Sequence, residues 1–517
     1  MMCRSICLAA ASILLIALGA HAELQNVEVG GSIEIWGNYY TPFYESGDPV
    51  IRIPGILTQG RPLGPFGTES YIRAYHRKSA DGCAWIEQRT TLNIKADFTE
   101  HVSAFIELDD IMDWGEDFRS AEYITGRDIR ADSSDDVEIY QAYIETDQMF
   151  GYPFRLRIGR QELIFGSEWL VGNNFWFCPL TYLSFDALRL TFAVEDWSVD
   201  AFASKLAERY VDHGDLDFYG LYATYAGIKE IAFDAYYFFL RDGQDVSDTQ
   251  ASWLTEKIED WMGVDNYGNT AIHTIGVRGA GEWNGLDYEV EAAYQWGDAS
   301  TLGQGFAAGI YGDDTARYNA FAGHCTLGYT LPVKFDPRLY ASFTYYGGED
   351  NRDISFKDWL NPFYKPKASV SFNRLFSSWE EDSFFDCGSL SNCWIATGGI
   401  EAAFTESIEA GAYLQYLQVV SPFDPPMMKR LGSHKIPVGW PFPFLTESGS
   451  KDIGFITNLW ASYAYSEDLT FEAGWSHLFT GDAIKKGAYF DYNGLGFMGG
   501  LDDDDADYFY IGSKLTF

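Results

Sequence analysis

The sequence is poor in cations, histidine and cysteine, and each shortage excludes a class of protein. Its 517 residues hold 36 Lys and Arg against 75 Asp and Glu, which gives a formal net charge of −39. Because such a chain repels polyanions, we expect no nucleic-acid partner. No H-E-x-x-H, G-x-S-x-G or P-loop motif occurs, and the seven cysteines lack a C-x2-C spacing with paired histidines. We therefore expect no enzyme, no cofactor and no patterned metal centre.

Long apolar runs are also scarce, and the one near the start is short. Residues 1–22 have an early cation at Arg4, an apolar run from Leu8 to Leu18, and an Ala20-His21-Ala22 end. This pattern predicts a signal peptide that is removed. A membrane anchor is the weaker alternative, because a spanning helix needs ~20 apolar residues. The remaining chain, 23–517, has no run of that length and is expected to form one domain.

Removal of residues 1–22 leaves five cysteines in an oxidising compartment. Cys387 and Cys393 are close enough in sequence to close a small loop. We take them as a disulfide candidate, with the pairing of the other three open.

What the chain has in abundance is period-2 alternation and aromatic residues, with 17% Phe, Trp and Tyr. In residues 286–297 apolar and polar side chains alternate, which is typical of a strand between two environments. About 18 such stretches occur, and helical periodicity is hard to find. They begin near Val27, Trp85, His101, Val137, Phe154, Asp186, Trp197, Asp217, Glu230, Ala271, Leu286, Arg317, Arg338, Thr397, Ile408, Ile453, Leu469 and Ala506. Aromatic clusters at their ends, such as 36–40 and 236–239, suit the aromatic belts of a membrane interface.

The connections between these stretches alternate between short turns and long polar segments. The long ones are 41–84, 112–136, 162–185, 241–270, 298–316, 348–396, 421–452 and 481–505. A secreted multi-domain β protein, the alternative, has no reason to keep its long loops at one end. The pattern predicts an all-β fold: a transmembrane antiparallel up-and-down barrel of about 18 strands, with short periplasmic turns and long extracellular loops. We expect outer-membrane lipid around the barrel. Lipid offers no hydrogen-bond partner to backbone N–H and C=O groups, so a sheet that spans it must close on itself.

The chain ends on Phe517, with Leu515, Gly512 and Tyr510 before it, and Phe509, Ile511, Leu515 and Phe517 share one face of the last predicted strand. This end resembles the C-terminal signal by which bacterial outer-membrane proteins are recognised. It implies the barrel-assembly machinery of a Gram-negative cell as a partner.

Residues 156–166 read Leu-Arg-Ile-Gly-Arg-Gln-Glu-Leu-Ile-Phe-Gly, and residues 185–190 read Phe-Asp-Ala-Leu-Arg-Leu. These two stretches resemble the alginate export family of outer-membrane porins. Family members carry a strand of the form R-x-G-R-Q-x-L-x-Y-G and, after a loop, a strand that opens near F-D-G-x-R-L. The matching residues here are Gly159, Arg160, Gln161, Gly166, Phe185, Asp186 and Arg189. Ser167, Trp169 and Ala187 depart from the family pattern. The resemblance implies an 18-stranded barrel and an export channel for alginate-like polysaccharide.

A set of cations is predicted to line the lumen, most of them by strand alternation and Arg160 from its place where the strand leaves the membrane, with Gly159 as a possible bulge. The candidates are Arg89, Lys95, Arg155, Arg157, Arg160, Arg189, Arg278 and Arg338. They either attract anions in transit or pair with lumen carboxylates and brace the wall. The carboxylates on the same face are Glu107, Asp109, Glu145, Asp200, Asp234, Asp287, Glu289, Glu291, Glu401, Glu409 and Glu472.

The sequence therefore predicts an outer-membrane porin or export channel for passive passage of polysaccharide or small solutes. The alternative is a surface barrel with a structural or adhesive role, whose loops bind glycans. We expect the long segments 41–84 and 348–396 to fold inward or cap the mouth. The run Asp502, Asp503, Asp504 and Asp505 is either a weak divalent-cation site or a solvated loop.

Overall fold

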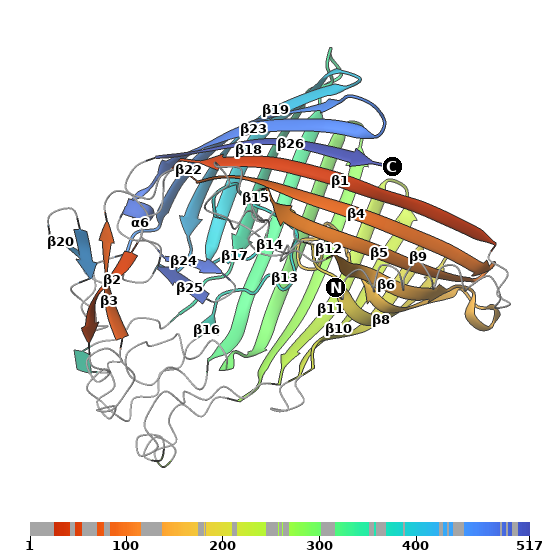
Figure 1. Ribbon diagram of the computed structural model, residues 1–517, viewed down its shortest axis with the longest axis horizontal. Helices are drawn as coiled ribbons and strands as arrows, with labels where there is room; N and C mark the ends of the chain where they lie inside the picture. Colours follow the sequence, from red (N-terminus) through yellow and green to blue (C-terminus); the bar gives the residue numbers. More distant parts are fainter. Residues whose placement is uncertain are drawn as a thin grey trace, which may run out of the picture.

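A closed ring of long inclined strands forms the molecule (Figure 1). This computed structural model describes residues 25–41, 47–53, 70–76, 83–114, 137–173, 180, 182–208, 215–243, 257, 261, 268–300, 316–350, 356–357, 369–385, 388–422, 428–431, 434–437, 449–485, 489–492, 495–498 and 505–517. None of the described helices is long or apolar enough to cross a membrane.

Eighteen of the described strands make the ring, each antiparallel to its neighbours. In chain order they are β1 (Asn26–Tyr40), β4 (Cys83–Thr99), β5 (Val102–Asp113), β6 (Glu138–Thr146), β7 (Phe154–Gln161), β8 (Phe185–Val194), β9 (Trp197–Ala207), β10 (Leu216–Ile228), β11 (Ile231–Asp242), β12 (Thr270–Trp283), β13 (Leu286–Asp298), β14 (Arg317–Thr330), β15 (Arg338–Tyr346), β18 (Cys393–Thr405), β19 (Ile408–Val419), β22 (Asp452–Ala464), β23 (Leu469–Thr480) and β26 (Ala506–Thr516). The ring closes between β1 and β26, where Ser32 is opposite Thr516 and Tyr40 opposite Tyr508. Closure leaves no strand edge without a backbone partner.

The predicted number, order and alternation of the strands are confirmed. Seventeen of the expected starts lie within two residues of the observed strand, and the exception is β18, which begins at Cys393 rather than Thr397. The missed residues are apolar on both faces, because Cys393 and Ile395 pack into a buried cluster inside the ring. Period-2 alternation is invisible there.

The outward face of the ring is apolar, as lipid contact requires. Strongly exposed side chains on it include Leu188, Val277, Leu414 and Ile511. The expectation that residues 236–239 form a membrane belt is half wrong. Tyr237 and Phe239 face outward, whereas Tyr236 and Phe238 are buried inside the ring, since adjacent strand residues point to opposite faces.

The long connections contain shorter elements. A four-stranded sheet joins β2 (Gly47–Ile53), β3 (Ser70–His76), β21 (His434–Pro437) and β20 (Met428–Leu431), and a three-stranded sheet joins β17 (Leu390–Ser391), β24 (Tyr489–Tyr492) and β25 (Leu495–Met498). The remaining elements are β16 (Ser369–Val370), η3 (Met149–Gly151) and α6 (Asp482–Lys485). In Figure 1, β2, β3 and β20 lie beyond the long-loop end of the ring. Part of segment 41–84 is therefore a strand pair beyond the mouth and not a plain loop.

Two expectations fall wholly or partly outside the described residues. The signal peptide, residues 1–22, lies outside them, and so does Cys387. Cys393 is buried at the start of β18, and the pairing of these two cysteines stays a prediction.

Candidate functional site

Two segments of the long connections fold into the ring. We call residues 162–173 the first inner segment and residues 371–385 the second inner segment. Backbone hydrogen bonds join them: Phe376 N–H donates to Leu170 O at 2.9 Å, and Gly172 N–H donates to Phe376 O at 2.8 Å. The expectation that 348–396 folds inward is thus confirmed for the second segment.

The first inner segment packs on aromatic side chains of the inner wall. Phe165 stacks on Tyr222 with ring centroids 4.9 Å apart and on Phe202 at 5.4 Å. Further along, the indole N–H of Trp169 donates to Tyr346 Oη at 2.8 Å. The segment therefore reaches along the wall from β9 to β15.

The second inner segment contacts the remaining wall. The Gln415 amide on β19 donates to Glu381 O at 2.6 Å, and the Tyr40 hydroxyl on β1 donates to Ser383 O at 2.8 Å. The two segments together line much of the inner circumference. Their apolar side chains join those of the wall in one buried cluster inside the ring.

The motif residues near 155–190 hold the first inner segment in place. Gly159 has a φ of 130°, and a Cβ there would lie 2.3 Å from Ala142 O, so glycine is needed for close strand contact. The expected bulge at Gly159 is wrong, because the pairing on both sides keeps its register. The fully buried amide of Gln161 donates to Ala187 O at 2.9 Å.

Gly166 and Phe185 extend this frame. Gly166 has a φ of 59°, and a Cβ there would lie 2.7 Å from Tyr222 Oη. Phe185 is fully buried and packs edge-on against Phe376 of the second inner segment, at a centroid distance of 5.2 Å. The motif residues therefore lie where the wall meets both inner segments.

Arg160 does not line the lumen, which corrects the expectation for this residue. It lies opposite Ala142 and Asp186 on the outward face, where its guanidinium binds the Asp186 carboxylate at 2.9 and 3.0 Å. Strand alternation explains this, because Arg155 and Arg157 face inward and an even-numbered neighbour points the other way.

The other candidate cations lie on the inner side of the ring, and most are bonded to carboxylates of adjacent strands. The pairs are Arg89–Asp109 at 2.9 Å, Arg157–Glu145 at 2.6 Å, Arg189–Asp200 at 2.8 Å, Arg278–Asp234 at 2.8 Å, Arg278–Glu289 at 3.0 Å, Arg338–Asp287 at 2.6 Å and Arg338–Glu401 at 2.8 Å. This arrangement supports the bracing role over a free ring of cations.

Arg89 is the most enclosed of these groups. It is buried, and its guanidinium carbon lies 3.8 Å from the ring centroid of Tyr182 and 5.0 Å from that of Tyr140. Burial, with the Glu34 carboxylate, raises the pKa of the Tyr182 hydroxyl. The phenol therefore stays neutral beside the cation at physiological pH.

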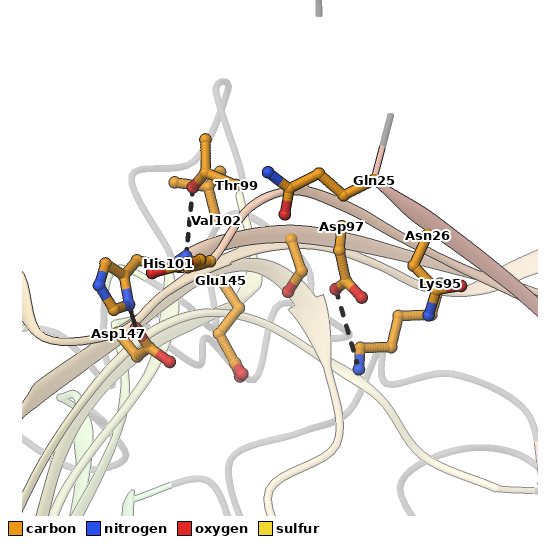
Figure 2. Close-up of a pocket in the computed structure, with 11 residues that line it drawn as sticks. Gln25, Asn26, Lys95, Asp97, Thr99, His101, Val102, Glu145 and Asp147 are labelled. Carbon is orange, nitrogen blue, oxygen red and sulfur yellow. Dashed lines mark hydrogen bonds and ion pairs between the residues drawn. The ribbon is translucent and has the colours of Figure 1, made fainter. Parts of the chain in front are cut away.

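Lys95 and Arg155 lie nearer the short-turn end and are exposed. Lys95 is 3.9 Å from Asp97, and within the described residues Arg155 has no ion pair. Figure 2 shows Lys95 at a polar cavity of about 300 Å³, with Glu145 and a His101–Asp147 contact of 2.6 Å on its rim.

Of the carboxylate run at 502–505, only Asp505 is described. It accepts hydrogen bonds from the backbone N–H and the hydroxyl of Thr480, at 3.0 and 3.2 Å. Sequence reasoning missed a different group, Glu289, Glu291 and His324, because only the register of β13 and β14 brings it together.

Comparisons with known proteins match the chain to one family. Residues 76–495 match the family model described as alginate export. Similar solved structures include OccK8 (OprE) of Pseudomonas aeruginosa, 11% identical over 95% of this chain and 98% of that chain with a TM-score of 0.49. OccAB1 of Acinetobacter baumannii is 12% identical over 96% and 98%, with a TM-score of 0.49. No curated protein matches the sequence.

Proposed function

The chain belongs to the alginate export family and forms an outer-membrane barrel, and we propose that it is a passive channel whose bore is set by the two inner segments. The proposal rests on one observation. The inner segments contact the wall at several points, from Tyr222 on β10 to Tyr40 on β1, and a cavity lined by polar side chains lies near the short-turn end. A fixed constriction with polar mouths sorts solutes by size and charge. No covalent step or cofactor is part of this function.

The charge of the wall indicates the class of solute. The guanidiniums of Arg157, Arg189 and Arg338 are each held by carboxylates, so they offer little attraction to a passing polyanion. Glu409 on β19 and Glu472 on β23 are further inward carboxylates, and they add negative charge to the wall. We infer that small neutral or cationic solutes pass more readily than alginate-like polyanions.

Planar-bilayer recording of the refolded protein tests the channel. We expect discrete conductance steps in the wild type. Replacing residues 371–385 by a short Gly-Ser linker should increase the step size, because the second inner segment no longer narrows the passage. Absence of any step in both proteins, after heat-modifiable mobility has verified folding, would count against a channel.

A plugged surface barrel is the second candidate, favoured by the apolar cluster that the inner segments bury inside the ring. On this account the wild type is silent in a bilayer, and only the linker variant conducts. Glycan binding by intact cells that display the barrel would then depend on the external segments.

We propose that residues 1–22 direct secretion and that Phe517, whose side chain is exposed and whose backbone pairs with Gly31, is read by the barrel-assembly machinery.

A further inference from the structure

Three potential metal ligands meet on the inner wall between β13 and β14. His324 lies directly opposite Glu291, and Glu289 is two residues before Glu291 on the same face. His324 Nε2 is 3.6 Å from Glu289 Oε1 and 3.7 Å from Glu291 Oε2. In a tetrahedral site with bonds of about 2.1 Å, neighbouring ligand atoms are roughly 3.4 Å apart. The three atoms are therefore spaced like ligands of a shared ion.

His324 is buried without a hydrogen-bond partner. Its side chain is 1% exposed, and neither ring nitrogen is hydrogen-bonded within the described part of the chain. The ring is enclosed by Trp169 of the first inner segment and Trp379 of the second, each at a centroid distance of 5.0 Å. A buried imidazole in this state costs free energy unless a cation or proton satisfies it.

The charges around His324 leave an excess of negative charge. Asp234, Glu289 and Glu291 supply three carboxylates, and among the described residues Arg278 is the one guanidinium that contacts them. With a neutral imidazole the cluster thus carries about two negative charges in excess, and burial makes such an excess costly. A divalent cation at His324 would balance it.

The oxygens that face His324 remain able to bind an ion. Glu291 Oε1 accepts a hydrogen bond from the Tyr236 hydroxyl at 2.7 Å. Within the described residues Oε2 accepts one weak hydrogen bond, from the Ser167 hydroxyl at 3.4 Å, and Arg278 Nε lies 3.9 Å from it. Glu289 Oε1 accepts from Arg278 Nε at 3.1 Å and retains a second lone pair. Arg278 therefore orients Glu289 through its Nε and Nη2 groups, while its Nη1 group binds Asp234.

We propose that Glu289, Glu291 and His324 bind one divalent transition-metal ion of the zinc class. An imidazole nitrogen with two carboxylate oxygens suits Zn²⁺ or Co²⁺ better than Ca²⁺ or Mg²⁺, which prefer oxygen-only sites. The ion joins the barrel wall at the point where both inner segments touch it. This site does not depend on whether the barrel conducts.

Metal titration of the folded full chain in detergent tests the site. After exhaustive chelation, the wild type should take up one equivalent of Co²⁺, displaced by Zn²⁺. His324→Gln and Glu291→Gln should each weaken Co²⁺ binding at least tenfold, with unchanged heat-modifiable mobility. His101→Gln, which removes the exposed histidine beside Asp147, is the matched control and should bind as the wild type does.

Three results would overturn the proposal. The first is a wild type that takes up no Co²⁺ or Zn²⁺, and the second is a His324→Gln protein that binds like the wild type. The third comes from X-ray absorption of the zinc-loaded wild type, which can be measured even if the variants fail to fold. We expect one imidazole nitrogen and otherwise mainly oxygen ligands. A shell of oxygen alone, or one containing sulfur, would contradict the assignment.

Discussion

Gln295 on β13 and Asn373 in the second inner segment form a closed pair of hydrogen bonds. The side-chain amide of Gln295 donates to Asn373 O at 2.6 Å, and its oxygen accepts from the Asn373 N–H at 2.8 Å. Gln295 is fully buried, so water does not compete for these groups. This pair fixes the start of the segment to the wall.

Gln295→Leu should loosen the second inner segment without unfolding the barrel. The Asn373 backbone groups lose their partners, which costs about 1–3 kcal/mol for buried groups. We expect larger or noisier single-channel currents and faster limited proteolysis near residue 373. Gln88→Leu, a change on the outward face, is the control and should alter neither.

Removing Arg89 should destabilise the barrel more than removing Arg160. The Arg89–Asp109 pair is buried on both sides, and an orphaned Asp109 carboxylate costs about 3–5 kcal/mol. The Arg160–Asp186 pair is about half exposed, so Arg160→Ala should cost about 0–1 kcal/mol. Urea unfolding followed by tryptophan fluorescence measures both. Equal losses of unfolding free energy in the Arg89 and Arg160 variants would contradict the difference in burial between the two pairs.

Gly159→Ala should destabilise by more than about 1 kcal/mol, because it adds both an unfavourable φ and a clash with Ala142 O. Gly398 on β18 is the matched control, since a Cβ there meets no atom within 4 Å. Gly398→Ala should be close to neutral in the same unfolding experiment. A neutral Gly159→Ala would remove the reason given for glycine in the motif.

The ring itself was predictable because lipid and lumen impose opposite demands on alternate residues. Stretches such as 286–297 reveal both demands at once, and their starts agree with the observed strands. Parity also placed Arg157, Arg278 and Arg338 on the inner wall. The prediction for Arg160 was wrong because this residue was included among the lumen candidates against strict alternation, which places it on the outward face.

The interior was much less predictable. Phe202, Phe218 and Phe238 face inward, where alternation alone predicts polar side chains, because the inner segments cover them. Which residues cover which wall depends on contacts between positions more than a hundred residues apart, such as Trp169 with Tyr346. The cross-strand register that unites Glu291 and His324 is likewise absent from any local pattern.

The reversal potential in a salt gradient across a planar bilayer tests the central claim most directly. The account predicts a cation-selective wild type, because the lumen arginines are neutralised by carboxylates and further carboxylates such as Glu409 and Glu472 face inward. Arg157→Ala should become more cation-selective by freeing Glu145, and Glu145→Gln should shift the potential toward anions by freeing Arg157. An anion-selective wild type, with selectivity lost in Arg157→Ala, would contradict the account and favour passage of a polyanion.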